Sequence, residues 1–478
     1  MWEEEYPLPG YQSVTERFVT WQFLGLGIIS TWLFAGDVTG GYAVCAAISA
    51  ITIFFYFFLG REPVIPGSER QAYLLQWSLL PFALFIIWVI GQFSPAIRPM
   101  YIGDTVYLQF DPPPHPWPIT GLPWSQIIYA LYVSTLQLAS IGIVAVVVSR
   151  HAVARVLWLL FLNAIVLALV GGITTIMRWE KILATFTPAQ PDFFSMFPSG
   201  HQWAAFGLFW VVVGFGMLFH IKRRGNWRSL LENKGIWLIG GWLLIIWSVY
   251  ETGAPVHRFL LGVALGLMSL RVGTALIRHL RTGVFSVLLG ALFSLAGLAL
   301  TASAAIYFVN ELFAAQTDET LMPFGVPLAV HEALWRDAWS LFMERPLFGW
   351  GAGSFSEVFV FHQQVDLGNA IYSSPQSDLL RGLVEHGAAG VLLWLAFPVS
   401  LAFAFARLKT RGALSHYLWA GATLLALLGV VTQPFMSPAN MVCFFMALPM
   451  AYKWSEAPKT GTGLFKPRKP KQRKNHHA

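Results

Sequence analysis

Residues 156–176 read VLWLLFLNAIVLALVGGITTI, an uninterrupted run without a charged side chain. An α-helix rises 1.5 Å per residue, so this run spans about 30 Å, the thickness of the hydrocarbon core of a bilayer. Similar runs fill most of the 478-residue chain, which is 56% hydrophobic and only 12% charged. A soluble domain carries about 25% charged residues. Because a backbone in lipid must satisfy its own hydrogen bonds, we expect an all-α polytopic membrane protein.

The whole sequence predicts about twelve transmembrane helices. The first six lie near residues 18–36, 41–59, 73–93, 127–148, 156–176 and 202–219. The other six lie near residues 235–250, 259–276, 284–309, 388–405, 417–431 and 440–452. The chain then divides into residues 1–309 with helices one to nine, a large external loop 310–387, residues 388–454 with helices ten to twelve, and a basic cytoplasmic tail 455–478.

Lysines and arginines are divided unevenly between the two sides of the membrane in this predicted topology. With both termini on one side, 24 of the 31 lysines and arginines lie on that side and 7 on the other. Basic loops stay in the cytoplasm, so we expect cytoplasmic N- and C-termini in the inner (plasma) membrane. Much of the net charge of +7 comes from residues 466–474, KPRKPKQRK, next to the last span. This position favours membrane lipid over nucleic acid as the partner of the tail.

The external loop 310–387 contains two predicted helices, and we expect it to cap an active site at the outer membrane face. In residues 327–344, large side chains recur on one helical face, which predicts a helix lying along the membrane interface. They are Leu328, His331, Trp335, Ala338, Trp339 and Phe342. A second helix is predicted from Pro375 to His386, with Ser374 as its N-cap and Gly387 as its C-terminal glycine.

The most specific motif lies in the same loop. Residues 335–355 read WRDAWSLFMERPLFGWGAGSF, and residues 373–390 read SSPQSDLLRGLVEHGAAG. This pattern resembles the core of the O-antigen ligase/O-antigen polymerase family of polytopic glycosyltransferases. The matching residues are Trp335, Pro346, Leu347, Gly349, Gly351, Gly353, Phe355, Leu380, Glu385, Gly387 and Gly390.

Weaker matches and two departures accompany this motif. His201 opens the segment HQWA where the family often has Asn-x-x-Ala, and His257–Arg258 stands where it often has Ser-Arg. The family has a histidine nine residues before the motif glutamate, Glu385, and in this sequence that position is Gln376. The arginine four residues before the motif tryptophan falls on His331. Glutamine cannot act as a base, so the resemblance leaves the base open.

The sequence contains no nucleotide-binding motif and no histidines and acids at metal-ligand spacings, so we expect no cofactor and no metal. The resemblance implies a glycosyltransferase at the outer face of a bacterial inner membrane. It would transfer or polymerise a glycan from a polyprenyl diphosphate-linked donor onto a glycan or glycolipid acceptor. A diphosphate leaving group develops negative charge, which guanidinium groups stabilise well. The candidate catalytic residues are Asp378, His331 and Glu385, and the candidate substrate-binding residues are Arg258, Arg336, Arg381, His201, Arg178 and Gln376. We favour Asp378 as the base.

These arginines also fit purely structural roles. Arg258 and Arg178 stand at span ends, where basic side chains extend to the membrane interface. Arg336 follows Glu332 by four residues, the spacing of a helical ion pair, and Arg381 shares a predicted face with two acidic residues.

Two other protein classes stay open. Residues 198–201, PSGH, also match a histidine motif of type 2 phosphatidic-acid phosphatases, but the second histidine of that family would fall on Ala264. Twelve spans also suit a transporter or flippase. Ion-coupled transporters keep ionisable groups in mid-membrane, however, and the predicted span interiors here hold few of them.

Overall fold

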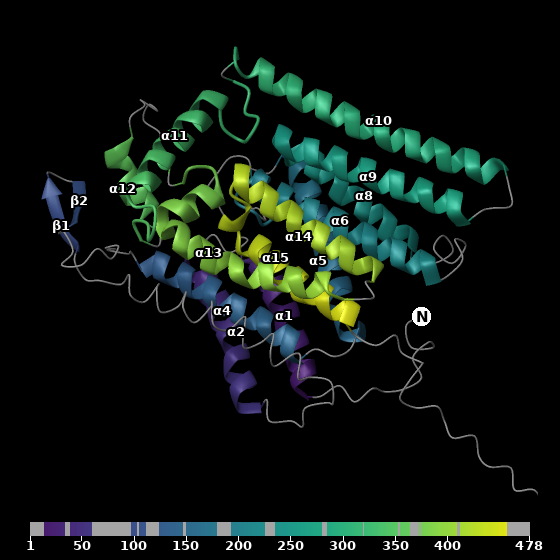
Figure 1. Ribbon diagram of the computed structural model, residues 1–478, viewed down its shortest axis with the longest axis horizontal. Coiled ribbons are helices and arrows are strands. Elements are labelled where there is room, and N and C mark those ends of the chain that lie inside the picture. The colour runs from purple at the N-terminus through teal and green to yellow at the C-terminus, as the bar shows by residue number, and fades with distance from the viewer. Residues whose placement is uncertain are drawn as a thin grey trace, which may run out of the picture.

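The chain forms a bundle of long helices with a smaller helical cap at one end (Figure 1). The computed structural model describes residues 14–33, 39–59, 97–102, 105–110, 124–146, 150–178, 193–224, 235–279, 284–318, 320–351, 354–363, 372, 374–408 and 412–456. The first helices are α1 (Val14–Trp32), α2 (Thr39–Leu59), α4 (Trp124–Val146), α5 (Arg150–Ile176), α6 (Gly200–Arg224) and α8 (Gly235–Thr252). The later helices are α9 (Pro255–His279), α10 (Val284–Ala314), α11 (Leu328–Glu344), α12 (Phe355–His362), α13 (Asp378–Ala406), α14 (Ala413–Val431) and α15 (Pro438–Glu456).

Six helices in the described part of the chain are long and apolar enough to cross a membrane, namely α5, α6, α9, α10, α13 and α14. Segments 41–51, 131–144 and 236–252 are shorter apolar helices. Each predicted span except 73–93, which lies outside the described residues, coincides with a helix. The structure is therefore that of a helical membrane protein, and the number of about twelve spans stays a prediction.

A small hairpin departs from the all-α expectation. Strand β1 (Ile97–Ile102) pairs antiparallel with β2 (Thr105–Phe110), with Ile102 opposite Thr105 at the turn. The hairpin falls in a segment between two predicted spans for which the sequence predicts no regular structure. It lies apart from the long helices in Figure 1.

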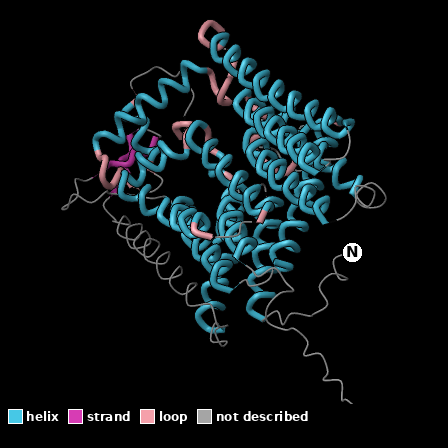
Figure 2. Tube along the Cα trace, turned by 45° about the vertical axis from the view of Figure 1, so that its right-hand side comes forward, coloured by secondary structure: helices cyan, strands magenta, loops and turns pink. Residues whose placement is uncertain are grey.

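Helix α6 packs against helices α8, α9 and α14 within the bundle. Figure 2 shows in a second view that helices make up nearly all of the described chain. Helix α6 is apolar on every side, and its Trp203 and Trp210 are fully buried. The indole N–H of Trp203 donates a hydrogen bond to Ser248 Oγ on α8 at 3.1 Å, which fixes the relative position of the two helices. A helix that is hydrophobic all round is expected in such a buried place.

Helices α9 and α10 form a close antiparallel pair at the edge of the bundle. Their backbones approach at Gly266 and Gly297, where a Cβ on Gly266 would lie 2.7 Å from the Gly297 carbonyl oxygen. Small residues allow this close approach between membrane helices. The outer face of α10 exposes large apolar side chains such as Leu288, Leu292 and Leu295, as a surface in contact with lipid would.

The cap has its own apolar core, formed between α11, α12 and α13. It contains Leu334, Ala338, Leu341, Phe355, Phe359 and Val384. The predicted bounds of α11 are confirmed to within a residue, and its position along the membrane interface stays a prediction. Trp339 is 52% exposed, whereas Leu334 and Leu341 are fully buried, because α12 and α13 cover the side of α11 that those leucines occupy.

Helix α13 is broken at Gly387, which has φ 64° and ψ −180°. The predicted end of the preceding helical segment at this glycine is confirmed. Its predicted start is wrong, because the helix begins at Asp378 and its N-cap is Ser377, whose side chain accepts a hydrogen bond from the Leu380 N–H. The expected cap, Ser374, instead takes part in a polar network described below.

The backbone around the break in α13 is hydrogen-bonded to the glycine-rich loop of the motif, residues 346–351. Within that loop, a Cβ on Gly349 would lie 2.6 Å from the backbone of Glu385 and Gly387. The Trp350 N–H donates to the Val384 carbonyl at 2.8 Å, and three further backbone bonds join the two segments. The motif glycines thus have a structural role, since they allow two backbones to touch and attach the cap to α13.

Candidate functional site

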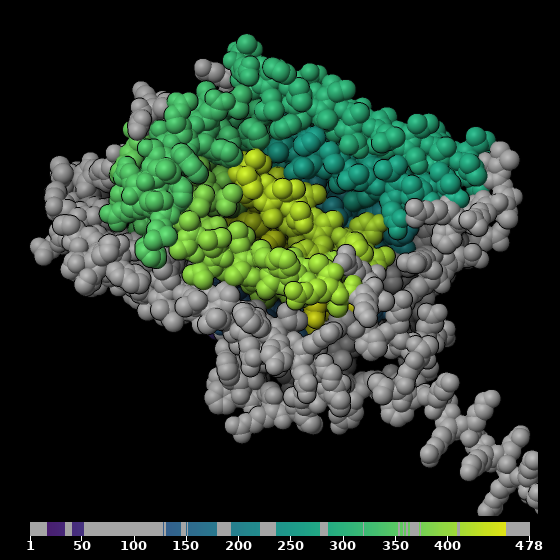
Figure 3. Space-filling view, viewed as in Figure 1, coloured from purple at the N-terminus to yellow at the C-terminus, as the bar shows by residue number. Residues whose placement is uncertain are grey.

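A cavity of about 600 Å³ opens at one end of the bundle. Helices α6, α9 and α13 begin at this end, and helices α5, α8 and α14 finish there. The residues that line it are Thr175, Phe193, Phe194, Ser199, His201, Gln202, Glu251, Thr252, His257, Met322, Phe324, Gly325, Val326, Gln376, Thr432, Gln433 and Pro434. In Figure 3, the green cap and the teal helices α9 and α10 lie to the left of and above the yellow-green α13 and α14.

Two histidines from different helices meet in the cavity wall. His201 lies in the first turn of α6, where its N–H donates to Ser199 Oγ at 3.3 Å. His257 lies in the first turn of α9, and the two rings stack with centroids 5.7 Å apart and planes 9° from parallel. Gly325, with φ +91°, packs against His201, since a Cβ there would lie 2.8 Å from the ring.

His257 is buried, with 1% of its surface exposed. Its Nδ1 atom has no hydrogen-bond partner among the described residues. A buried polar nitrogen without a partner costs free energy in an empty site. It is therefore a candidate to bind a group of the ligand.

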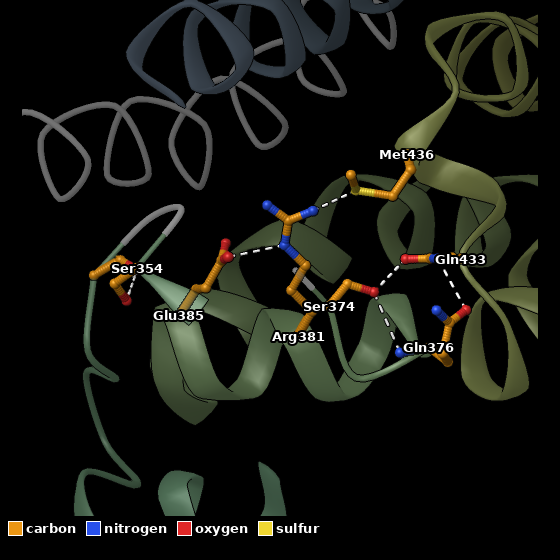
Figure 4. A network of polar contacts seen from close by, with 8 residues as sticks. Ser354, Ser374, Gln376, Arg381, Glu385, Gln433 and Met436 are labelled. Atoms are coloured by element: carbon orange, nitrogen blue, oxygen red, sulfur yellow. Dashed lines mark hydrogen bonds and ion pairs between the residues drawn. The ribbon is translucent and has the colours of Figure 1, made fainter. Parts of the chain in front are cut away.

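Gln376 enters the cavity from the segment just before α13, with a left-handed backbone at φ 54°. Three residues form a closed network here (Figure 4). The Gln376 backbone N–H donates to Ser374 Oγ at 3.2 Å, the Ser374 hydroxyl donates to Gln433 Oε1, and Gln433 Nε2 donates to Gln376 Oε1 at 2.9 Å. Because the side-chain oxygen of Gln376 is used in this way, its amide N–H₂ group is left as the donor for a ligand.

Asp378, the favoured base, holds the start of α13 to the segment that follows α14. Its Oδ2 accepts a hydrogen bond from the Phe435 N–H at 2.8 Å, and its own N–H donates to the Thr432 carbonyl at 3.1 Å. Asp378 is half-buried, and it is not among the residues that line the cavity. The structure thus gives it a positioning contact beside the cavity.

Arg381 and Glu385 form a buried ion pair on α13. Arg381 Nε donates to Glu385 Oε1 at 2.8 Å, and Arg381 Nη1 also donates to the sulfur of Met436 (Figure 4). Both side chains are buried. The charge of Arg381 is therefore compensated within the protein, one helical turn after the polar network of Gln376.

Arg258 lies beside the cavity, on the neighbouring face of α9. Its Nε donates to the Tyr250 carbonyl at 2.9 Å, and Nη1 donates to the Tyr307 hydroxyl at 3.4 Å. The guanidinium also lies over the ring of Tyr250, 5.2 Å from its centroid. Two aromatic residues thus hold this cation at the helix end, next to cavity-lining His257.

The other two candidate arginines lie outside the cavity. Arg178 follows the end of α5 in a left-handed turn with φ 52°, and its side chain is exposed. Arg336 is exposed on α11, and the described structure shows no ion pair between it and Glu332. Neither residue is brought together with His201 and Gln376.

His331 lies behind one wall of the cavity. Its ring stacks on Phe324 at 4.6 Å between centroids, and Trp335 lies 4.9 Å away on α11. Burial lowers the pKa of His331 from 6.5 to about 4, so the ring is neutral at physiological pH. It supports Phe324, which lines the cavity, and does not itself line it.

Sequence reasoning missed several polar residues of the cavity, among them Glu251 and Gln433. Glu251 and Gln433 stand just after apolar runs, residues 235–250 and 417–431 respectively. Polar side chains at the outer ends of predicted spans are the signal that would have found them. Among the described residues, no group of three or more histidine, cysteine or acidic side chains is arranged to hold a metal.

Comparisons with known proteins add no family to this description. No family model matches the sequence, and no curated protein matches it.

Proposed function

We propose that the chain is a membrane glycosyltransferase of the O-antigen ligase or polymerase type. One observation carries the proposal. The resemblance singled out the positions of His201, His257 and Gln376 in three separate parts of the sequence, and all three side chains line the same cavity. A fortuitous motif match gives no reason for such positions to converge.

The composition of the cavity wall also supports this reaction class. Gln202, Gln376, Gln433 and three threonines offer amide and hydroxyl groups, which suit the hydroxyls of a sugar, and phenylalanine rings offer apolar faces. The volume falls within the range of about 300–1,000 Å³ that is usual for ligand sites.

Arg258 is the proposed contact for the diphosphate of the donor. It lies in the first turn of α9, directly after cavity-lining His257, and its guanidinium contacts Tyr250 and Tyr307 outside the cavity lining. A carrier lipid alongside α9 and α10 would present its diphosphate at this depth. Arg381 is less suited, because Glu385 already compensates its charge.

The proposed orientation places this cavity at the outer face of a bacterial inner membrane, with both termini in the cytoplasm. The helix ends that build it belong to segments on the side with few basic residues, whereas the basic loops lie at the opposite helix ends. Polyprenyl-linked glycans would reach the cavity from that outer leaflet. Glutamate or histidine in the wall, or Asp378 beside it, would accept the proton of the acceptor hydroxyl.

The glycan pool of cells tests the proposal. Removing the chain should cause a polyprenyl-linked glycan to accumulate, and the wild-type chain should clear it. The His201→Ala variant should fail to clear it. The matched control is His416→Ala, an exposed histidine near the start of α14, about 20 Å along that helix from the cavity. An unchanged pool after removal, or equal clearance by both variants, would refute the proposal.

A further inference from the structure

The described cavity wall contains an acidic side chain and no lysine or arginine. Glu251 supplies the one carboxylate among the described residues that line the cavity. Arg258 and Arg381 do not line the cavity; Arg258 contacts Tyr250 and Tyr307, and Arg381 pairs with Glu385. A ligand that fills the cavity therefore meets neutral donors and acceptors and one negative charge.

From this distribution we infer that the cavity binds the uncharged sugar portion of the substrate and discriminates against acidic sugars. The inference rests on the proposed function and names the substrate class for its site. A uronate or another anionic sugar placed here would face Glu251 without a compensating cation. A neutral sugar would instead donate its hydroxyl hydrogens to the carboxylate.

The polar network gives the neutral sugar its second contact. Gln376 is held by Gln433 so that its N–H₂ group is presented as a donor, and a sugar hydroxyl or acetamido oxygen can accept from it. His257 also lines the cavity, and its Nδ1 is buried without a partner among the described residues. An amide, a neutral histidine and a carboxylate together match a ligand with many hydroxyls.

The substitution that tests this inference is Glu251→Gln, which keeps the shape of the side chain and removes its charge. The matched control is Glu332→Gln, an exposed glutamate on α11 that does not line the cavity. Binding is measured by isothermal titration of the purified full chain with two oligosaccharides of equal length, one neutral and one carrying a uronate.

The wild type should bind the neutral oligosaccharide about tenfold more tightly, and raising the salt concentration should narrow the difference. Glu251→Gln should bring the two affinities close together, and Glu332→Gln should leave the ratio unchanged. Equal affinities in the wild type, binding of neither sugar, or a ratio that Glu251→Gln does not alter would overturn the inference. This experiment measures binding and not transfer. A protein that binds the neutral oligosaccharide more tightly but transfers no glycan would therefore refute the proposed function and leave the inference intact.

Discussion

The break of α13 at Gly387 leads to a quantitative prediction about the attachment of the cap. In Gly387→Ala, the new Cβ would lie 2.4 Å from the backbone carbon and oxygen of Leu347. Neither contact can be relieved by rotating a side chain. The residue would also have to keep φ at 64° with ψ at −180°, which essentially only glycine adopts, at a strain of about 1–3 kcal/mol.

Relief of the clash requires the loop and the helix to separate, which weakens four backbone hydrogen bonds. These join Trp350 N to Val384 O, Gly351 N to Glu385 O, Ala388 N to Pro346 O and Ala389 N to Leu347 O, at 2.8, 2.8, 2.8 and 3.1 Å. Each contributes about 0.5–1.5 kcal/mol. Together with the strain, the expected loss of stability is about 3 kcal/mol or more.

The assay is thermal unfolding of the purified protein in detergent, followed by tryptophan fluorescence. The matched control is Gly382→Ala on the same helix, where the new Cβ would meet only Val391 Cγ2 at 3.4 Å. Alanine in a helix is favoured over glycine by about 1 kcal/mol, so this control should melt at or slightly above the wild-type temperature. If Gly387→Ala melts together with the Gly382→Ala control, the described contact between loop and helix is not what attaches the cap.

Four further predictions concern the charged and titrating residues. Arg381→Met should destabilise the protein by about 3–5 kcal/mol because it leaves Glu385 buried and unpaired, and adding Glu385→Leu should restore most of the melting temperature. The pKa of His331 is lowered from 6.5 to about 4 in the folded protein, so between these pH values the unfolded chain binds more protons than the folded one. The stability of the fold should therefore fall by up to about 3 kcal/mol as the pH drops from 6.5 to 4. The His331→Phe variant should show a flatter dependence of stability on pH. Arg258→Ala should slow glycan transfer by about one and a half to three and a half orders of magnitude, with partial rescue by lysine, and near-normal transfer would exclude a diphosphate contact. Asp378→Asn retains an oxygen for the Phe435 N–H, so a properly folded variant that keeps more than about a tenth of the transfer rate would show that Asp378 is not the base.

Local sequence signals predicted much of the helical fold. The apolar runs coincide with helices, and proline and glycine marked the limits of α11 and the break at Gly387, because these residues act on their own backbone. The sequence did not predict which side chains of α11 are buried within the cap. Leu334 and Leu341 are buried by α12 and α13, and nothing in the sequence of α11 itself reveals that partner.

The candidate site was predicted in part for the same physical reason. His201 and Gln376 line the cavity, and a motif could point to them because they stand at fixed distances from other motif residues. The contacts of Asp378 with Phe435, and of Arg258 with Tyr307, join segments 57 and 49 residues apart. Such pairings depend on how the helices pack, and the sequence pattern of either segment alone does not encode them.

Glycan transfer by the purified chain in lipid vesicles is the measurement that tests the proposed function most directly. With a polyprenyl diphosphate-linked glycan and a neutral acceptor sugar, we expect a new glycosidic bond and the release of one polyprenyl diphosphate for each bond formed. His201→Ala and His257→Ala should lower the rate about tenfold or more, because each removes a polar contact in the cavity, whereas His416→Ala should leave it unchanged. Release of inorganic phosphate without a glycan product, or movement of the donor across the bilayer without any bond formed, would contradict the assignment as a glycosyltransferase.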